Sequence, residues 1–442
     1  MNKSTGPFVI KGEFVITSPF NEPIRNGAVV IDGSRIVDTG PWIDIKDKYK
    51  DADVVERHSG LIAPGLINCH THAPMVLLRG MADDLPLKTW LEDHIFPAEA
   101  KLTKEIVESA TLLACAEMIR SGTTTFVDMY FFERQMAQVV DKVGMRAYLG
   151  EGIFDFPSPA FENAKRVMEE TKGLVDLYKD HPLIHFTVDP HTPYTCSSDI
   201  LVESAQFARA NGLPIVIHLS ETKWEFDETL SLHSKTPVQY LEELGLLGQD
   251  LLAVHCVWLE DKDIELLAKN NVSVVHCPES NLKLASGVCP VAKLLEAGVN
   301  VALGTDGAAS NNNLDMLSEM DVAAKLPKGT LLDPTVVNAQ QVLYMATESG
   351  GKALGTKDLG RLQPGFQADL IVIDLDRPHL RPCYNPVSQM VYAATSGDVS
   401  DVMVAGRFIM ERGKLITIDE KRLLEKIKSF QNRPFWQEDP CN

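Results

Sequence analysis

The chain of 442 residues contains no pair of cysteines at the C-x-x-C spacing, although it has eight cysteines. Scattered cysteines in a chain of this length indicate reduced, mostly buried thiols and argue against a disulfide framework. The absence of cysteine pairs also argues against a closed structural zinc site. The cysteines are Cys69, Cys115, Cys196, Cys256, Cys277, Cys289, Cys383 and Cys441.

Long apolar runs and a basic excess are missing as well. No apolar stretch is long enough to cross a bilayer, and the first residues show no apolar core followed by a small-residue cleavage site. We therefore expect a cytoplasmic protein with no membrane partner. The net charge of -19 at pH 7 also argues against nucleic acid as a partner.

Short apolar segments alternate with amphipathic stretches between residues 61 and 360, which is typical of parallel βα units. One of the helical stretches is 104–121. Eight parallel strands with crossover helices predict an α/β fold, a (β/α)8 TIM-like barrel. The expected strands are 61–68, 123–128, 146–150, 183–189, 214–218, 251–255, 272–276 and 299–306.

The two ends of the chain have a different residue pattern. Residues 1–60 and 361–442 contain short β-rich segments broken by glycine, asparagine and proline. We expect these two parts to form one small β-sandwich domain into which the barrel, residues 61–360, is inserted. The tail 419–442 is expected to be a short helix followed by a disordered end.

Two histidines one residue apart follow the first expected barrel strand. Alternate side chains of an extended strand point the same way, so His70 and His72 can bind one metal ion together. His218, His255 and Asp306 each end another expected strand. The C-terminal ends of barrel strands meet on one face, and the chemistry of such barrels takes place there.

Imidazole and carboxylate ligands suit Zn²⁺, with Fe²⁺ or Mn²⁺ as alternatives. Three histidines and Asp306 would hold one divalent cation per chain and leave a position for water, whose pKa a metal lowers to about 7. His255 is either a further ligand or a catalytic group that orients this water and stabilises a developing oxyanion. We favour the catalytic role, because Asp306 already completes a mononuclear set.

Two further residues follow the expected strands closely. Glu221 comes three residues after His218, where a carboxylate can transfer protons between water and substrate. The alternative is a solvated glutamate at a helix start, where negative charge is favoured. His191, two residues past the fourth strand, is expected to hydrogen-bond the substrate rather than to fill the core.

Several segments carry a resemblance to a known family. PGLINCHTH, HLSET, VHC, HCPESNLKLASG and GTDGAASNN resemble the amidohydrolase superfamily, and within it the 5′-methylthioadenosine/S-adenosylhomocysteine deaminases. The resemblance covers nearly the whole chain, and GMADDLPLKTWLEDHIFPAE is specific for the adenosine-type and related aminohydrolase branch. It implies hydrolytic deamination of a 5′-modified adenosine to the inosine analogue and ammonia, with a small-molecule nucleoside as the binding partner.

The resemblance also implies individual roles. Glu221 would contact the purine ring and carry the proton, His255 would polarise the attacking hydroxide, and Asp306 would also accept a proton from water. Glu99 would hold the ribose hydroxyls, His191 would make another nucleoside contact, and Trp90 would form part of the wall above the site. The implied metal ligands are His70, His72, His218 and Asp306.

One position departs from the family pattern. Relatives that use S-adenosylhomocysteine well carry arginines after the third strand, which can bind the amino-acid carboxylate bidentately. Here Glu151 stands where an arginine is expected, and the next arginine is Arg166. We expect Glu151 to repel an anionic substituent, so that the uncharged methylthio group is preferred.

Two other kinds of function stay open. The zinc site of cytidine deaminases uses a P-C-x-x-C motif that this chain lacks, but an aminohydrolase or halohydrolase for another purine, pyrimidine, pterin or triazine ring would share the site. Glu99 and His191 favour a nucleoside, because a free base has no ribose diol to hold. A non-catalytic barrel that serves as a binding module is disfavoured, because every ligand is present. Association into a homo-oligomer is left open.

Overall fold

The computed structural model describes residues 6–432. Cys441 and the end of the predicted tail therefore lie outside the described residues, and the predicted domain boundaries stay a prediction. The described chain divides into two compact units. The first unit comprises residues up to Asn68, Glu117–Thr125 and Asp315–Thr417, and the second comprises Cys69–Ala116, Phe126–Leu314 and the residues from Ile418 onward.

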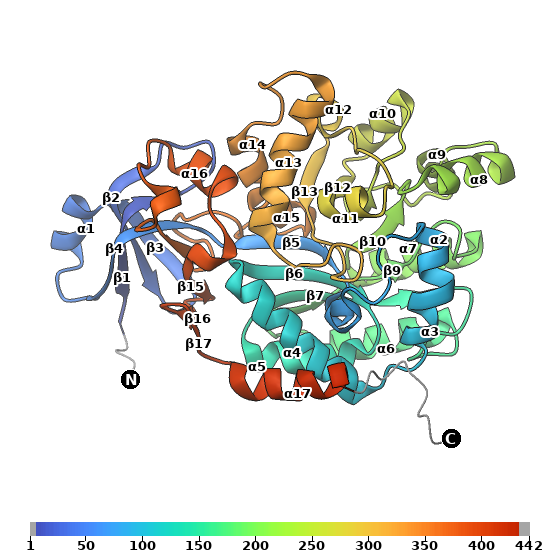
Figure 1. Ribbon diagram of the computed structural model, residues 1–442, viewed down its shortest axis with the longest axis horizontal. Helices are drawn as coiled ribbons and strands as arrows, with labels where there is room; N and C mark the ends of the chain where they lie inside the picture. Colours follow the sequence, from blue (N-terminus) through green and yellow to red (C-terminus); the bar gives the residue numbers. More distant parts are fainter. Residues whose placement is uncertain (1–5, 433–442) are drawn as a thin grey trace. The chain divides into compact units, whose positions relative to one another are not determined.

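The first unit contains one eight-stranded sheet in the order β17-β16-β15-β14-β4-β1-β2-β3. Figure 1 shows that blue strands from the beginning of the chain and red strands from its end lie in this one sheet. The two sets meet where β14 pairs antiparallel with β4. The strands are β1 (Phe8–Val15), β2 (Ile24–Asp32), β3 (Arg35–Pro41), β4 (Asp53–Pro64), β14 (Leu370–Asp374), β15 (Val399–Val404), β16 (Arg407–Glu411) and β17 (Lys414–Leu415).

The barrel strands form two parallel arcs, β5-β6-β7-β8 with β9 beside β7, and β10-β11-β12-β13. A parallel bridge between Val188 and Ile215 joins the arcs on one side. On the other side the Asp306 amide donates to the His70 carbonyl at 3.0 Å. The strands are β5 (Leu66–Thr71), β6 (Thr123–Tyr130), β7 (Arg146–Ile153), β8 (Ile184–Phe186), β9 (Asp189–Pro190), β10 (Ile215–Leu219), β11 (Leu251–His255), β12 (Ser273–His276) and β13 (Asn300–Leu303).

The predicted barrel is therefore confirmed, but two of its strands differ from the prediction. The expected strand 61–68 is wrong as one strand, because its first residues end β4 and its last residues begin β5. Gly65 separates them, and a Cβ atom there would lie 2.2 Å from the Thr124 hydroxyl oxygen, so only glycine fits. The fourth expected strand is likewise divided into β8 and β9.

Helices connect the barrel strands as the alternating pattern predicts. The expected helix 104–121 is α4 (Lys104–Arg120). Two short helices, α2 (Leu87–Thr89) and α3 (Phe96–Glu99), flank a π-helical turn, Trp90–Ile95, after the first barrel strand. The other helices of the second unit are α5 (Glu133–Val143), α6 (Ala164–Leu177), α7 (Ser198–Asn211), α8 (Lys223–His233), α9 (Pro237–Glu243), α10 (Asp261–Lys269), α11 (Pro278–Lys283), α12 (Val291–Glu296) and α17 (Glu420–Asn432).

The first unit also carries helices, namely α1 (Trp42–Lys48), α13 (Met316–Leu331), α14 (Ala339–Met345), α15 (Glu348–Ala353) and α16 (Pro386–Tyr392).

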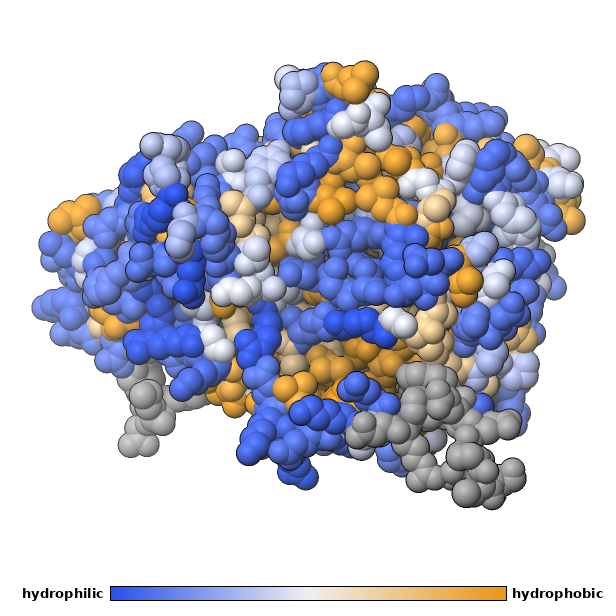
Figure 2. Space-filling model, in the orientation of Figure 1, coloured by the Kyte–Doolittle hydropathy of each residue, from blue (hydrophilic) through white to orange (hydrophobic). Residues whose placement is uncertain are grey.

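Hydrophilic residues predominate on the face that Figure 2 shows. Among the described residues, no helix is both long enough and apolar enough to span a membrane. The described cysteines are all free thiols, and six of these seven are buried, as their scattered spacing predicts.

Candidate metal centre and surrounding cavity

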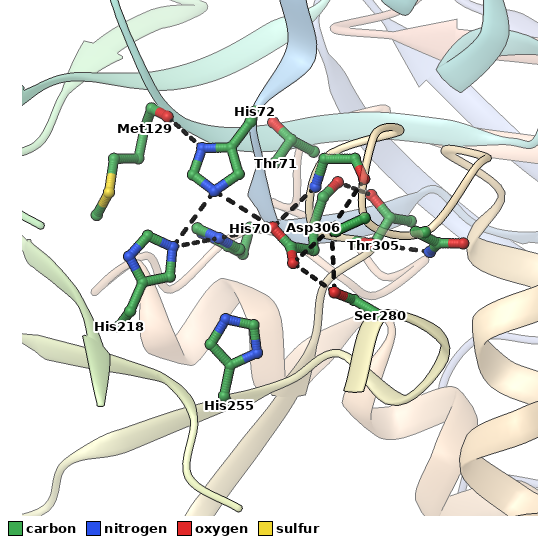
Figure 3. A network of polar contacts seen from close by, with 12 residues as sticks. His70, Thr71, His72, Met129, His218, His255, Ser280, Thr305 and Asp306 are labelled. Atoms are coloured by element: carbon green, nitrogen blue, oxygen red, sulfur yellow. Dashed lines mark hydrogen bonds and ion pairs between the residues drawn. The ribbon is translucent and has the colours of Figure 1, made fainter. Parts of the chain in front are cut away.

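Four of the predicted ligands converge at the C-terminal ends of the barrel strands (Figure 3). One ligand atom from each of them lies within 4.8 Å of the others. The Nε2 atom of His218 lies 3.1 Å from that of His70 and 3.3 Å from that of His72. The Asp306 Oδ1 atom lies 3.4 Å and 3.2 Å from the same two His70 and His72 atoms.

The second ring nitrogen of two of these histidines is already engaged. His72 Nδ1–H donates to the Met129 carbonyl at 2.5 Å, and His218 Nδ1–H donates to the His191 carbonyl at 2.9 Å. Each Nε2 atom therefore presents its lone pair to the shared centre, and two such lone pairs 3.3 Å apart are suited to a cation between them. Burial lowers the pKa of His70 to about 4, so this imidazole is in the neutral form that binds metal. At His72 burial acts in the same direction, but the hydrogen bond and the negative charge of Asp306 outweigh it and raise the pKa to about 9, so a cation would displace a proton there. This donor set fits a divalent cation.

Neighbouring side chains fix the remaining ligand and the paired histidines. Asp306 has a backbone φ of 61°, and its Oδ2 atom accepts hydrogen bonds from the Ser280 and Ser310 hydroxyls at 2.6 Å and 2.9 Å. Between the paired histidines, the Thr71 hydroxyl donates to Asp128 Oδ1 at 2.6 Å. The ligand positions are thus held by bonds to the protein itself, which is how metal sites are commonly preorganised.

Glu221 and His255 face each other beside the metal cluster. The Glu221 carboxylate lies 3.8 Å from His255 Nε2, and His255 Nδ1–H donates to the Asn281 side chain at 2.9 Å. His255 has φ of 74°, a left-handed conformation that non-glycine residues adopt at a cost and that clusters at functional sites. Burial raises the pKa of Glu221 above its usual value, which suits a group that carries a proton.

The loop that carries Glu221 is held by a second glutamate. Glu225, in the first turn of α8, accepts the backbone N–H groups of Ser220 and Glu221 at 2.8 Å and 2.7 Å. Ser220 has φ of 53°, so the chain turns sharply directly after β10. Glu225 therefore sets the position from which the Glu221 side chain enters the cavity.

The predicted nucleoside contacts line the same cavity as the metal cluster. Glu99 and Trp90 come from the helical segment after β5, and His191 follows β9. Burial raises the pKa of Glu99 to about 7 and lowers that of His191 to about 3. Every predicted site residue except His70 therefore lines this cavity. The His70 side chain is fully buried beneath the cavity surface.

Glu151 does not have the surroundings expected from the sequence. Its carboxylate points to the start of α5, where it accepts the backbone N–H groups of Phe132 and Glu133 at 2.9 Å and 3.0 Å. It does not line the cavity, and burial raises its pKa to about 8. The expectation that Glu151 repels an anionic substituent is therefore wrong, because this carboxyl group binds a helix N-terminus instead.

The sequence interpretation missed several residues that support the site. Ser280 and Asn281 lie in the segment HCPESNLKLASG, whose position after β12 could have marked them as neighbours of the strand-end ligands. Ser310 lies four residues after Asp306, so its hydroxyl can return to the same carboxylate. Asp128 ends the expected strand 123–128, and Glu225 follows Thr222 at the T-x-x-E spacing of a helix start, so both positions also carried a signal.

Comparison with known proteins shows the family to which this chain belongs. Residues 61–409 match the amidohydrolase family model. The chain is 49% identical over 421 residues to a 5-methylthioadenosine/S-adenosylhomocysteine deaminase of Syntrophobacter fumaroxidans, covering 95% of this chain and 96% of that one. It is 46% identical over 408 residues to a 5′-deoxyadenosine deaminase of Methanothermobacter thermautotrophicus, covering 91% and 93%.

A solved structure is similar over almost the whole length. The zinc-bound adenosine deaminase from Xanthomonas campestris has a TM-score of 0.93 and 38% sequence identity, over 96% of this chain and 98% of that one. The family match spans the barrel and every candidate ligand. With its strand-end histidines and aspartate converging as described, the chain belongs to the amidohydrolase family.

Proposed function

We propose that this protein catalyses the hydrolytic deamination of 5′-modified adenosines. The preferred substrate would be 5′-methylthioadenosine, with S-adenosylhomocysteine used more weakly, and the products would be the inosine analogue and ammonia. Relatives that are 49% and 46% identical carry the names of deaminases for such nucleosides. The reaction replaces the exocyclic amine at C6 of adenine by oxygen from water.

One observation carries this proposal. A His/His/His/Asp cluster, a buried glutamate and a strand-end histidine open into a single cavity. We propose a single Zn²⁺ ion held by His70, His72, His218 and Asp306, in agreement with the donor types. When bound, a divalent cation of this kind makes a water-derived nucleophile available at neutral pH.

The protein side chains would supply the proton transfers. The C6 atom of adenine is a poor electrophile while the ring remains aromatic, so Glu221 would donate a proton to N1 as oxygen adds at C6. With its Nδ1–H engaged by Asn281, His255 directs Nε2 toward Glu221, and in its protonated form it would donate a hydrogen bond from Nε2 to the added oxygen. Asp306 would accept a proton from the attacking water and pass it to the exocyclic amine, which leaves as ammonia. The proton of the hydroxyl group added at C6 would return to Glu221 as the 6-oxo group forms.

The proposed nucleoside contacts favour a nucleoside over a free base. Glu99 would accept hydrogen bonds from the ribose hydroxyls, His191 would contact the nucleoside, and Trp90 would cover the ring. A free base has no ribose hydroxyls and would leave this interaction of the buried Glu99 carboxyl group unmade. A homo-oligomeric state and a cytoplasmic location remain predictions from the sequence.

The direct test is turnover of 5′-methylthioadenosine, S-adenosylhomocysteine, adenosine and 5′-deoxyadenosine by the zinc-loaded protein. We expect stoichiometric release of ammonia and formation of the 6-oxo nucleoside, with the highest kcat/KM for 5′-methylthioadenosine. Guanine, cytosine, a pterin and a chlorinated triazine serve as controls for the other ring hydrolases. Turnover of one of these rings with no turnover of any adenosine would contradict the proposal.

A further inference from the structure

Three phenylalanine side chains form a continuous wall on the outward side of the cavity. The ring centroid of Phe156 lies 5.0 Å from that of Phe154 and 6.2 Å from that of Phe96. Phe96 and Phe154 line the inner cavity that contains the metal cluster, and Phe96 and Phe156 line a larger outer cavity next to it. We call Phe96, Phe154 and Phe156 the phenylalanine wall.

The phenylalanine wall connects the two residues proposed to hold the nucleoside. Phe96 and Glu99 are three residues apart on α3 and therefore lie on the same side of that helix. At its other end, the Phe154 ring lies 4.6 Å from the ring of His191. If the adenine ring lies at the metal cluster and the ribose at Glu99 and His191, the 5′ substituent would extend past these two residues toward the rings, which lie between the inner and outer cavities.

The backbone makes room for this arrangement. Gly152 lies in β7, and a Cβ atom at this position would come within 2.9 Å of the Phe154 ring. The Phe154 ring is 7% exposed, whereas Phe156 is 43% exposed and covers the side toward the outer cavity. The segment that carries both rings follows the third barrel strand, β7.

Charged groups near the phenylalanine wall offer no open cation for a substrate carboxylate. The residues that line the inner cavity include no lysine or arginine. The outer cavity is lined by three lysines, and each is matched by an acidic side chain: Lys88 lies 3.9 Å from Glu92, Lys223 lies 2.6 Å from Asp227, and Lys283 lies 2.7 Å from Asp83. An amino-acid carboxylate that reached this region would compete with these acidic side chains for the lysines.

We propose that the phenylalanine wall recognises an uncharged, apolar 5′ substituent and thereby determines which 5′-modified adenosines the enzyme uses. This inference rests on the proposed deaminase function. A methylthio group would bury its methyl and sulfur against aromatic rings, which is favourable for both. A 5′-hydroxyl would lose hydrogen bonds to water there, and a zwitterionic homocysteine group would lose more.

The test compares kcat/KM for 5′-methylthioadenosine, adenosine and S-adenosylhomocysteine in two variants. Phe154→Ala removes the inner ring, so kcat/KM for 5′-methylthioadenosine should fall about tenfold or more relative to adenosine. Phe156→Arg places a cation at a position that is 43% exposed, so the protein should still fold. It should raise kcat/KM for S-adenosylhomocysteine relative to 5′-methylthioadenosine by about tenfold, the value of one charge-assisted hydrogen bond.

Phe20→Arg is the matched control, because Phe20 is also exposed, at 55%, and lines neither cavity. It should leave all three kcat/KM values unchanged. If Phe154→Ala and Phe156→Arg turn over adenosine but keep the wild-type ratios among the three nucleosides, the inference is overturned while the proposed function stands. If the wild-type protein deaminates none of the three, the proposed function itself fails.

Discussion

Glu221→Gln should lower kcat for 5′-methylthioadenosine by about 10²–10⁴-fold, the usual contribution of a positioned general acid or base. The glutamine keeps the shape of the side chain but cannot give a proton to N1. Glu221 is not a member of the His/Asp cluster, so metal content should be unchanged. KM should change much less than kcat, because the proton transfer belongs to the transition state.

Glu228→Gln is the matched control, since Glu228 lies in the adjacent helix α8 and is exposed. It should retain wild-type kcat and KM. Both variants should be analysed for metal before the kinetics are compared. A Glu221→Gln enzyme with full metal content and near-normal kcat would show that the proton reaches N1 by another route.

Asp306→Asn should reduce both metal binding and turnover. The neutral amide is a poorer ligand than a carboxylate, and it cannot take a proton from water. Its hydrogen bonds from Ser280 and Ser310 would also be weakened, because a charged acceptor would be lost. If the substitution removes several kcal/mol of the transition-state stabilisation that the metal provides, kcat/KM should fall about 10³-fold or more.

The control for this variant is Asp199→Asn, an exposed aspartate on α7. Metal content by elemental analysis and kcat/KM should both equal the wild-type values. Adding excess Zn²⁺ to Asp306→Asn should restore part of the bound metal but not full activity, because the proton acceptor is still missing. Full activity of Asp306→Asn without added metal would contradict both proposed roles of this residue.

The metal cluster was predictable from the sequence because the barrel topology itself brings the ligand side chains together. His70, His72, His218 and Asp306 each follow or end a short apolar segment, and parallel strands in a closed barrel bring such ends together. The prediction therefore needed only the correct strand ends. It did not depend on the exact start of a strand, so the wrong boundary around Gly65 left the ligand set unaffected.

Contacts that loops determine were not predictable in the same way. Glu151 was expected in the substrate site because of its place in the sequence, yet its carboxylate binds the start of α5. Whether a side chain near a strand end turns into the cavity or toward the next helix depends on local backbone geometry. The phenylalanine wall was missed for the same reason, because Phe96 and Phe156 lie 60 positions apart in the chain and meet only through loop packing.

We propose that three imidazoles and one carboxylate hold a single divalent cation in this barrel. Anomalous diffraction from crystals of the zinc-loaded protein, measured on both sides of the zinc absorption edge, tests it most directly. We expect one anomalous peak in the cavity, bonded to Nε2 of His70, His72 and His218 and to the Asp306 carboxylate. Absence of that peak, or a peak bonded to other residues, would show that these four side chains do not hold the metal.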